Sequence, residues 1–105
     1  MKIIYNNIIP FRGFKCINLF GVLFTRKGEV LSERNIQHEY IHTLQMKELL
    51  YIGFYLWYIF EWIFRLFLQG NAYRNISFER EAYSNENNKK YIGVRKKFAW
   101  TNYLK

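Results

Sequence analysis

The stretch that organises this chain is SERNIQHEYIHTLQMK, residues 32–47. Ser32 is a favoured helix N-cap, and Glu33 places a negative charge in the first turn, where the helix dipole favours it. Apolar side chains follow at Ile36, Tyr40 and Leu44, which is the spacing of one face of an amphipathic helix. The pattern predicts a helix over residues 32–47, with its first helical turn at about residue 33.

The middle of this helix carries an H-E-x-x-H motif that contains both histidines of the chain, His38 and His42. Residues four apart lie on the same helix face, so the two imidazoles can present nitrogens to one Zn²⁺. Glu39 then lies beside the open coordination position, where it can act as a general base on water. The motif predicts a zinc-dependent hydrolase, and first of all a peptidase that acts on a peptide or protein substrate.

Two histidines leave a catalytic zinc short of one protein ligand, because three protein ligands and one open position is the usual arrangement. The chain has no third histidine and no aspartate, so a glutamate or Cys16 must complete the set. Cys16 is the only cysteine, and we expect it to behave as a small apolar side chain rather than as a ligand that keeps the site latent. The downstream candidates are Glu48, Glu61, Glu79, Glu81 and Glu86.

Residues 49–69 form the second conspicuous segment, a nearly continuous apolar and aromatic run. Its only charged residues, Glu61 and Arg65, are spaced i, i+4 and are expected to pair on one face. We predict a backing helix that is buried in the domain or peripheral to a membrane. A transmembrane span stays open as the alternative, since the run approaches the length that crosses a bilayer.

The remaining segments complete one domain, residues 1–105. Residues 1–31 are the strand region. It begins with an irregular segment or short strand, interrupted by Pro10 and Gly13. A strand is then expected over residues 16–25, and its edge can pair with an extended substrate. Ser77 is expected to cap a helix over residues 77–88, and residues 89–105 form a basic, aromatic tail, either a short helix or an extended arm. The expected class is α+β, mainly helical, with a short antiparallel sheet.

The net charge of +8 favours anionic partners, a membrane surface among them. No nucleic-acid partner is expected, because the aromatic residues gather in the apolar segment instead of alternating with the basic tail. Asn6 and Asn7 interrupt the first apolar residues, so we find no signal peptide and expect a cytoplasmic or membrane-associated protein. A latent form, in which the basic tail fills the cleft, stays open.

The two motifs together resemble the gluzincin pattern, in which H-E-x-x-H on one helix is followed by E-x-x-A on a second, the glutamate helix. Here the second motif is Glu79-Arg80-Glu81-Ala82, and the resemblance, over about residues 16–88, implies Glu79 as the third Zn²⁺ ligand and Glu81 as the fallback. The short length resembles the minigluzincins, which implies a small zincin-like metallopeptidase domain. Many relatives carry Asp where this chain has Tyr83, so Tyr83 or Glu81 is the candidate for support of a ligating histidine.

Overall fold

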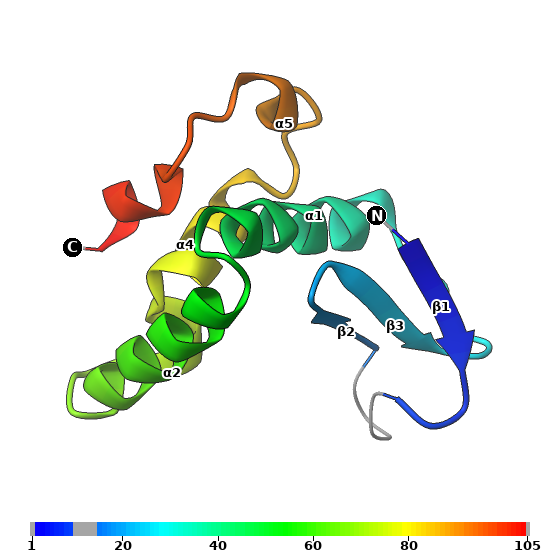
Figure 1. Cartoon of the computed structure of the whole chain (residues 1–105), viewed down its shortest axis with the longest axis horizontal. Helices are drawn as coiled ribbons and strands as arrows, with labels where there is room; N and C mark the ends of the chain where they lie inside the picture. Colours follow the sequence, from blue (N-terminus) through cyan, green and yellow to red (C-terminus); the bar gives the residue numbers. More distant parts are fainter. Residues whose placement is uncertain (1, 10–14, 105) are drawn as a thin grey trace.

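A computed structural model of the chain describes residues 2–9 and 15–104 and confirms the α+β class. Strands β1 (Lys2–Asn6), β2 (Cys16–Leu19) and β3 (Val22–Arg26) come first, and the helices follow. These are α1 (Glu33–Glu48), α2 (Ile52–Leu66), α3 (Ala72–Asn75), α4 (Ser77–Asn85), α5 (Tyr91–Val94) and the 3₁₀ helix η1 (Ala99–Tyr103). In Figure 1, α1 bridges the molecule, with the sheet below one end and α2 descending from the other.

The sheet has the order β1-β3-β2 and is mixed, so the prediction of an antiparallel sheet is only partly right. β2 pairs antiparallel with β3, whereas β1 pairs parallel with β3. The single strand predicted over residues 16–25 is in fact a hairpin, because Phe20 and Gly21 both take positive φ values, 52° and 88°, as a tight two-residue turn requires. β2 is therefore an edge strand. The predicted breakers Pro10 and Gly13 lie outside the described residues.

Helix α1 begins as predicted, with Ser32 as its N-cap. The Ser32 hydroxyl accepts from the Asn35 backbone N–H (3.1 Å), and the Asn35 side chain accepts in return from the Ser32 backbone N–H (3.2 Å). This reciprocal cap satisfies two donors that the first turn would otherwise leave unpaired. Leu50 and Tyr51 take positive φ values after the helix, and the chain turns there by 109° into α2.

Helix α2 is shorter than predicted, and of the two alternatives for it, buried in the domain or peripheral to a membrane, the buried one is wrong. Only Phe54 and Glu61 of this helix are buried, and Phe54 is its one member of the core cluster formed with Met46, Ile76, Phe78 and Trp100. A domain of this size has too few other elements to cover both sides of the helix. Within residues 2–9 and 15–104, no single helix is long and apolar enough to cross a membrane, and only α1 and α2 taken together as a bent pair pass that test.

The predicted ion pair between Glu61 and Arg65 does not form. Glu61 instead accepts from the backbone N–H of Ser77 (3.0 Å) and from its hydroxyl (2.5 Å), and Arg65 donates to the carbonyl oxygen of Leu104 (3.0 Å). The first N–H groups of a helix lack internal partners and attract a carboxylate. Ser77 is accordingly not the cap of α4 but its first residue, after the N-cap Ile76, and Glu61 fixes where α4 starts.

The tail contains two short helices, α5 and η1, so the helical alternative for it is confirmed. Trp100 of η1 packs into the core against Phe78, with ring centroids 4.9 Å apart. The tail thus covers the outer side of α4 (Figure 1).

Candidate metal centre

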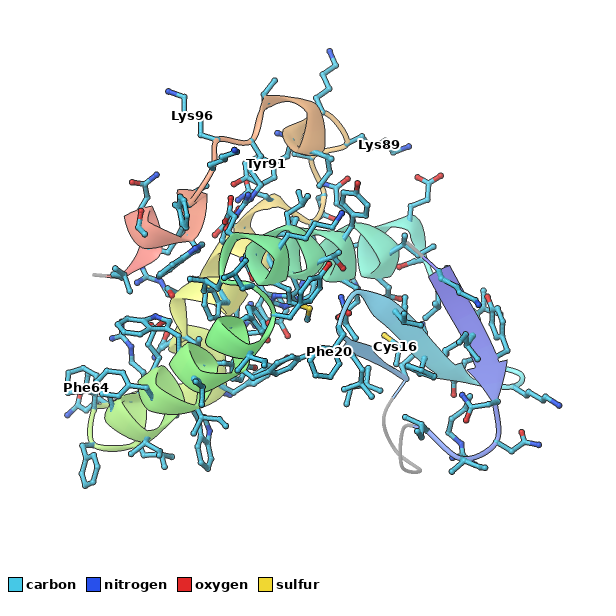
Figure 2. All side chains as sticks on the ribbon, in the orientation of Figure 1. Cys16, Phe20, Phe64, Lys89, Tyr91 and Lys96 are labelled. Carbon is cyan, nitrogen blue, oxygen red and sulfur yellow. The ribbon has the colours of Figure 1, made fainter. Side chains whose placement is uncertain are left out.

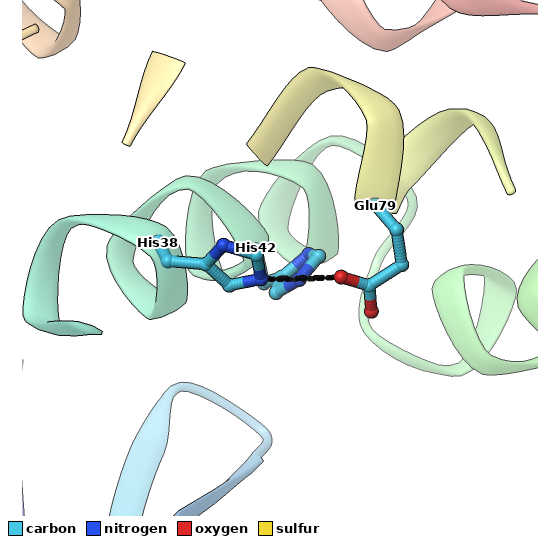
Figure 3. A group of neighbouring side chains, drawn as sticks. All are labelled: His38, His42 and Glu79. Atoms are coloured by element: carbon cyan, nitrogen blue, oxygen red, sulfur yellow. Dashed lines mark hydrogen bonds and ion pairs between the residues drawn. The ribbon is translucent and has the colours of Figure 1, made fainter. Parts of the chain in front are cut away.

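Three side chains from two helices converge on one point. His38 Nε2 and His42 Nε2 of α1 each lie 3.1 Å from Glu79 Oε1 of α4, and the two nitrogens lie 3.2 Å apart. Figure 3 shows both imidazoles facing the Glu79 carboxylate across the gap between the helices. All three residues are buried, and of the described residues only these three form a group with the makeup and spacing of a metal site.

This triangle has the dimensions of one face of a zinc tetrahedron. Zinc–ligand bonds of about 2.0–2.1 Å at tetrahedral angles place neighbouring ligand atoms about 3.3 Å apart. The observed 3.1, 3.1 and 3.2 Å are close to that value. The donor set, two imidazoles and one carboxylate, is one that catalytic zinc uses. The residues present therefore fit a zinc ion with an open fourth position.

The far nitrogen of each imidazole is held by an acceptor. His38 Nδ1 lies 2.7 Å from Glu86 Oε2, and His42 Nδ1 lies 2.8 Å from Gln45 Oε1. Each Nδ1 then carries the hydrogen and donates it, which leaves the Nε2 lone pair directed at the centre. Three acceptor atoms thus meet at one point, an arrangement that repels itself unless a cation or a proton lies between them.

Glu86 supplies a carboxylate to the outer nitrogen of His38, the supporting role for which the sequence suggested Tyr83 or Glu81. α4 ends at Asn85, and its C-cap Glu86 keeps helical backbone angles (φ −66°, ψ −21°), so Glu86 lies two turns after Glu79 on the same face of α4 and its side chain reaches His38. Tyr83 instead packs its ring edge-on against the His38 ring, with centroids 4.6 Å apart, and carries the Arg74 guanidinium on its other side at 4.0 Å. Glu86 was a candidate ligand by type, and its spacing of two helical turns from Glu79 is the signal that could have placed it on the same helix face.

Glu81, the fallback ligand, does not join the three. It is fully buried and accepts from Gln45 Nε2 (3.0 Å), from the Tyr91 hydroxyl (2.6 Å) and from Arg95 Nε (2.6 Å). Because Gln45 also accepts from His42, hydrogen bonds run without a break from His42 through Gln45 and Glu81 to Arg95. Glu81 thus supports a ligating histidine at one remove, through Gln45.

A cavity of about 460 Å³ opens beside the centre. Glu39, His42 and Glu79 line it, together with Tyr58 and Tyr73, and the rest of its wall is largely apolar. β2 forms one side and α2 the other, and Figure 2 shows Phe20, at the tip of the hairpin, between them. Glu39, the candidate general base, therefore faces the same cavity as His42 and Glu79.

The charges at the centre perturb one another strongly in the metal-free protein. Burial alone would lower the pKa of His42, but the charge and hydrogen bond of Glu79 outweigh it and raise that pKa to about 9. Burial alone would raise the pKa of Glu79, and here the two histidines outweigh it and hold that pKa below its usual value. A proton on the imidazole thus occupies the place that fits a metal.

The pKa values of Glu39, Tyr58 and Tyr73 are all raised. Burial raises the pKa of Glu39, although the neighbouring charges of His42 and His38 oppose the rise. Burial and the charge of Glu79 raise the pKa of both Tyr58 and Tyr73, so both hydroxyls keep their protons. The Tyr58 hydroxyl donates to Glu79 Oε2 (2.8 Å), which leaves Oε1 for the centre.

No protein-family model, curated protein or solved structure matches this chain. The interpretation of the site therefore depends on its own geometry.

Two further features bear on access to the site. Of the described tail residues, 89–104, none lines the cavity, so the structure gives no support to a tail that fills the cleft. Cys16 does line it, but burial and the nearby charge of Glu39 raise the pKa of its thiol to about 11. The thiol stays neutral near pH 7, which matches the expectation of a small apolar side chain rather than a ligand.

The edge strand is tied directly to the helix that carries the motif. The buried Asn18 side chain of β2 donates to the Glu39 backbone carbonyl (2.8 Å) and to the Thr43 hydroxyl (2.9 Å). The Tyr55 hydroxyl of α2 donates to the Asn18 carbonyl oxygen (3.2 Å) and accepts from the Phe20 backbone N–H (3.0 Å). β2 is thus held at a fixed height along α1, beside the catalytic candidates.

Proposed function

We propose that this protein is a zinc-dependent metallopeptidase of the minigluzincin kind, which hydrolyses peptide bonds with Glu39 as the general base. The observation that carries the proposal is the convergence of His38 Nε2, His42 Nε2 and Glu79 Oε1 at tetrahedral spacing. Their outer atoms are all engaged by hydrogen-bond partners, so the inward atoms have no other evident function.

When bound there, Zn²⁺ supplies the Lewis acidity that activates water and polarises the scissile carbonyl. Glu39, on the open side, takes a proton from the attacking water. As the carbon–nitrogen bond breaks, Glu39 passes that proton to the leaving amine, so protons and charge balance over the cycle. Its raised pKa suits both steps, because a base that must later act as an acid works best with a pKa near the working pH.

Tyr73 is the residue we assign to stabilise the developing negative oxygen. Four residues are of a suitable type for this role, namely Tyr73, Arg80, Tyr83 and Tyr91. Of these, Tyr83 packs on His38, Tyr91 donates to Glu81, and Arg80 donates to the Tyr103 carbonyl. Tyr73 alone among them lines the cavity, and its protonated hydroxyl is a suitable donor.

The edge strand β2 supports binding of an extended peptide. Successive residues of a strand direct their backbone groups alternately to either side, so an edge strand presents a row of donors and acceptors to a new partner. β2 forms one wall of the cavity that contains Glu39. A substrate strand added there passes the catalytic group, which is a recurrent mode of peptide recognition. Zn²⁺ is the implied cofactor, and we infer action in the cytoplasm or at a membrane surface.

The first experiment measures zinc by elemental analysis in the wild type and in Glu79→Ala, with Glu29→Gln as the control at an exposed site. We expect one zinc per chain in the wild type and in the control, and loss of zinc in Glu79→Ala. Wild-type protein that stays free of zinc after refolding in a zinc-containing buffer would refute the proposal.

The second experiment separates catalysis from metal binding. Glu39→Gln keeps the shape of the side chain but removes the base, so we expect it to retain zinc and to lose at least about a hundredfold in kcat on an unfolded protein substrate. If the wild type binds zinc and cleaves no peptide, the alternative of a zinc-binding or membrane-associated accessory protein without catalysis takes its place.

A further inference from the structure

Helix α2 presents a large apolar face to solvent. Leu56, Ile59, Phe60, Ile63, Phe64 and Phe67 recur at helical spacing, and each is between 48% and 85% exposed. At roughly 200 Å² for a large side chain, this face amounts to on the order of 700 Å² of exposed apolar surface. The largest apolar patch of a typical monomer is about 300–600 Å², so a patch of this size indicates an interaction site.

The charged residues of α2 do not interrupt this face. Glu61 is buried and bound to the start of α4, and Arg65 reaches back to the carbonyl oxygen of Leu104. Figure 2 places Phe64 at the far end of α2, away from α1 and the sheet. The outward side of the helix is therefore apolar along its whole length, and the inward side is fixed to the rest of the domain.

The length of α2 decides how such a face can meet a membrane. Its 15 residues extend about 22 Å at 1.5 Å each, which is less than the roughly 30 Å of a bilayer core. A helix of this length with one apolar face lies in the plane of the interface, buried to part of its width. The aromatic residues on and beside the face, Trp62 among them, are of the type that favours this boundary.

The charges around α2 favour an anionic bilayer over a second copy of the chain as the partner of its apolar face. The ionic groups that border α2 are basic: Lys47 precedes it, Arg65 belongs to it, and Arg74 lies on α3, which packs against it. The nearby carboxylate of Glu48 is neutralised by Arg95, as Glu61 is held by Ser77. Two copies that each carry a net charge of +8 repel, whereas an anionic surface attracts the same charge.

We propose that the outward face of α2 docks this protein onto the interface of an anionic lipid bilayer, with the helix parallel to the surface. The proposal goes beyond the metallopeptidase assignment and is independent of it, because none of the six residues that form the face lines the cavity or contacts the metal candidates.

The test is flotation of the purified protein with vesicles of phosphatidylcholine alone, or with roughly three parts phosphatidylcholine to one part phosphatidylglycerol. The test variant is Phe60→Ser with Ile63→Ser, on the outward face of α2. The matched control is Val30→Ser with Val94→Ser, two residues that are 79% and 69% exposed on other segments. Circular dichroism and the thermal unfolding midpoint verify that both variants fold.

We expect the wild type and the control to float with the anionic vesicles, at least about tenfold more strongly than with the neutral ones. The Phe60/Ile63 variant should lose at least about tenfold in binding. Wild-type protein that stays unbound, or a Phe60/Ile63 variant that binds as the wild type does, overturns the proposal, and equal binding to both vesicles overturns the role of charge. A wild-type dimer that this variant dissociates, without flotation, assigns the face to a second copy.

Discussion

The replacement Arg95→Gln tests how far the tail stabilises the domain. The Arg95 side chain is only 4% exposed and bonds with both Glu48 oxygens, at 2.9 and 3.1 Å, and with Glu81 at 2.6 Å. The two carboxylates are 9% and 0% exposed. Removing the cation leaves two buried negative charges, and removal of one partner from a buried ion pair typically costs about 3–5 kcal/mol.

That loss is large against the free energy of unfolding of a small domain, about 5–15 kcal/mol. At about 4–6 °C per kcal/mol, we expect Tm of the zinc-free protein to fall by roughly 12–30 °C. Urea unfolding in the presence of a chelator, followed by circular dichroism, measures the change directly. Lys96→Gln, at the exposed neighbouring position, is the control and should stay within about 0.5 kcal/mol of the wild type.

A second readout connects the tail to the metal. Because Arg95 and Gln45 bond to the same carboxylate, that of Glu81, loss of Arg95 should also loosen the acceptor that orients His42. We expect zinc affinity to fall by about tenfold, the lower end of effects seen when outer partners of a ligand are removed. Arg95→Gln that changes the unfolding free energy by less than about 1 kcal/mol would refute the reasoning on burial and pairing.

Three further predictions follow from the centre. In the zinc-free protein the pKa of His42 is raised from 6.5 to about 9, so its contribution to stability is complete below pH 6.5 and is lost as pH rises through 9. The pKa of Glu79 is lowered, so its contribution to stability is lost as pH falls below 4.5. The urea concentration at the midpoint of unfolding should therefore be highest between pH 4.5 and pH 6.5. A midpoint that stays constant from pH 6 to pH 9 contradicts the assigned charges. Glu86→Gln should weaken zinc binding by about 10–100-fold in competition with a chelating dye, while Glu29→Gln leaves it unchanged. Tyr73→Phe should lower kcat by about a hundredfold or more with little change in KM, and an unchanged kcat rules out its role on the oxyanion.

The convergence of His38, His42 and Glu79 was predictable because it depends mostly on local spacing. His38 and His42 share a face by helical periodicity alone, and the Ser32 cap fixes where that helix begins. Glu79 needed the resemblance as well, since Glu81 and Glu86 offer the same chemistry nearby in sequence. The structure distinguishes the three through long-range contacts: Glu81 bonds to Arg95, and Glu86 bonds to the outer nitrogen of His38, Nδ1, so neither joins the centre.

The exposure of α2 could not be read from its sequence. An apolar helix shows the same composition whether the domain covers it on all sides or leaves one side open, and only the number of neighbouring elements decides. The partner of Glu61 was misjudged for a related reason. Arg65 is its neighbour along the helix, but the start of α4, sixteen residues later, offers a buried N–H group and hydroxyl to Glu61, while Arg65 donates to the Leu104 carbonyl.

The continuous hydrogen bonding from His42 to Arg95 also affects when, during synthesis of the chain, the proposed metal site becomes complete. A nascent chain that has emerged as far as residue 90 already carries His38, His42 and Glu79, yet it lacks the guanidinium that holds Glu81, and through it Gln45. The proposed metal-binding face of α1 is then present, and Gln45, the acceptor for His42, is held by the Phe78 carbonyl and by a Glu81 carboxylate that still lacks its cation. We therefore expect full affinity for the proposed zinc ion only after the segment from Tyr91 to Arg95 has folded back onto α4, when the domain is nearly complete.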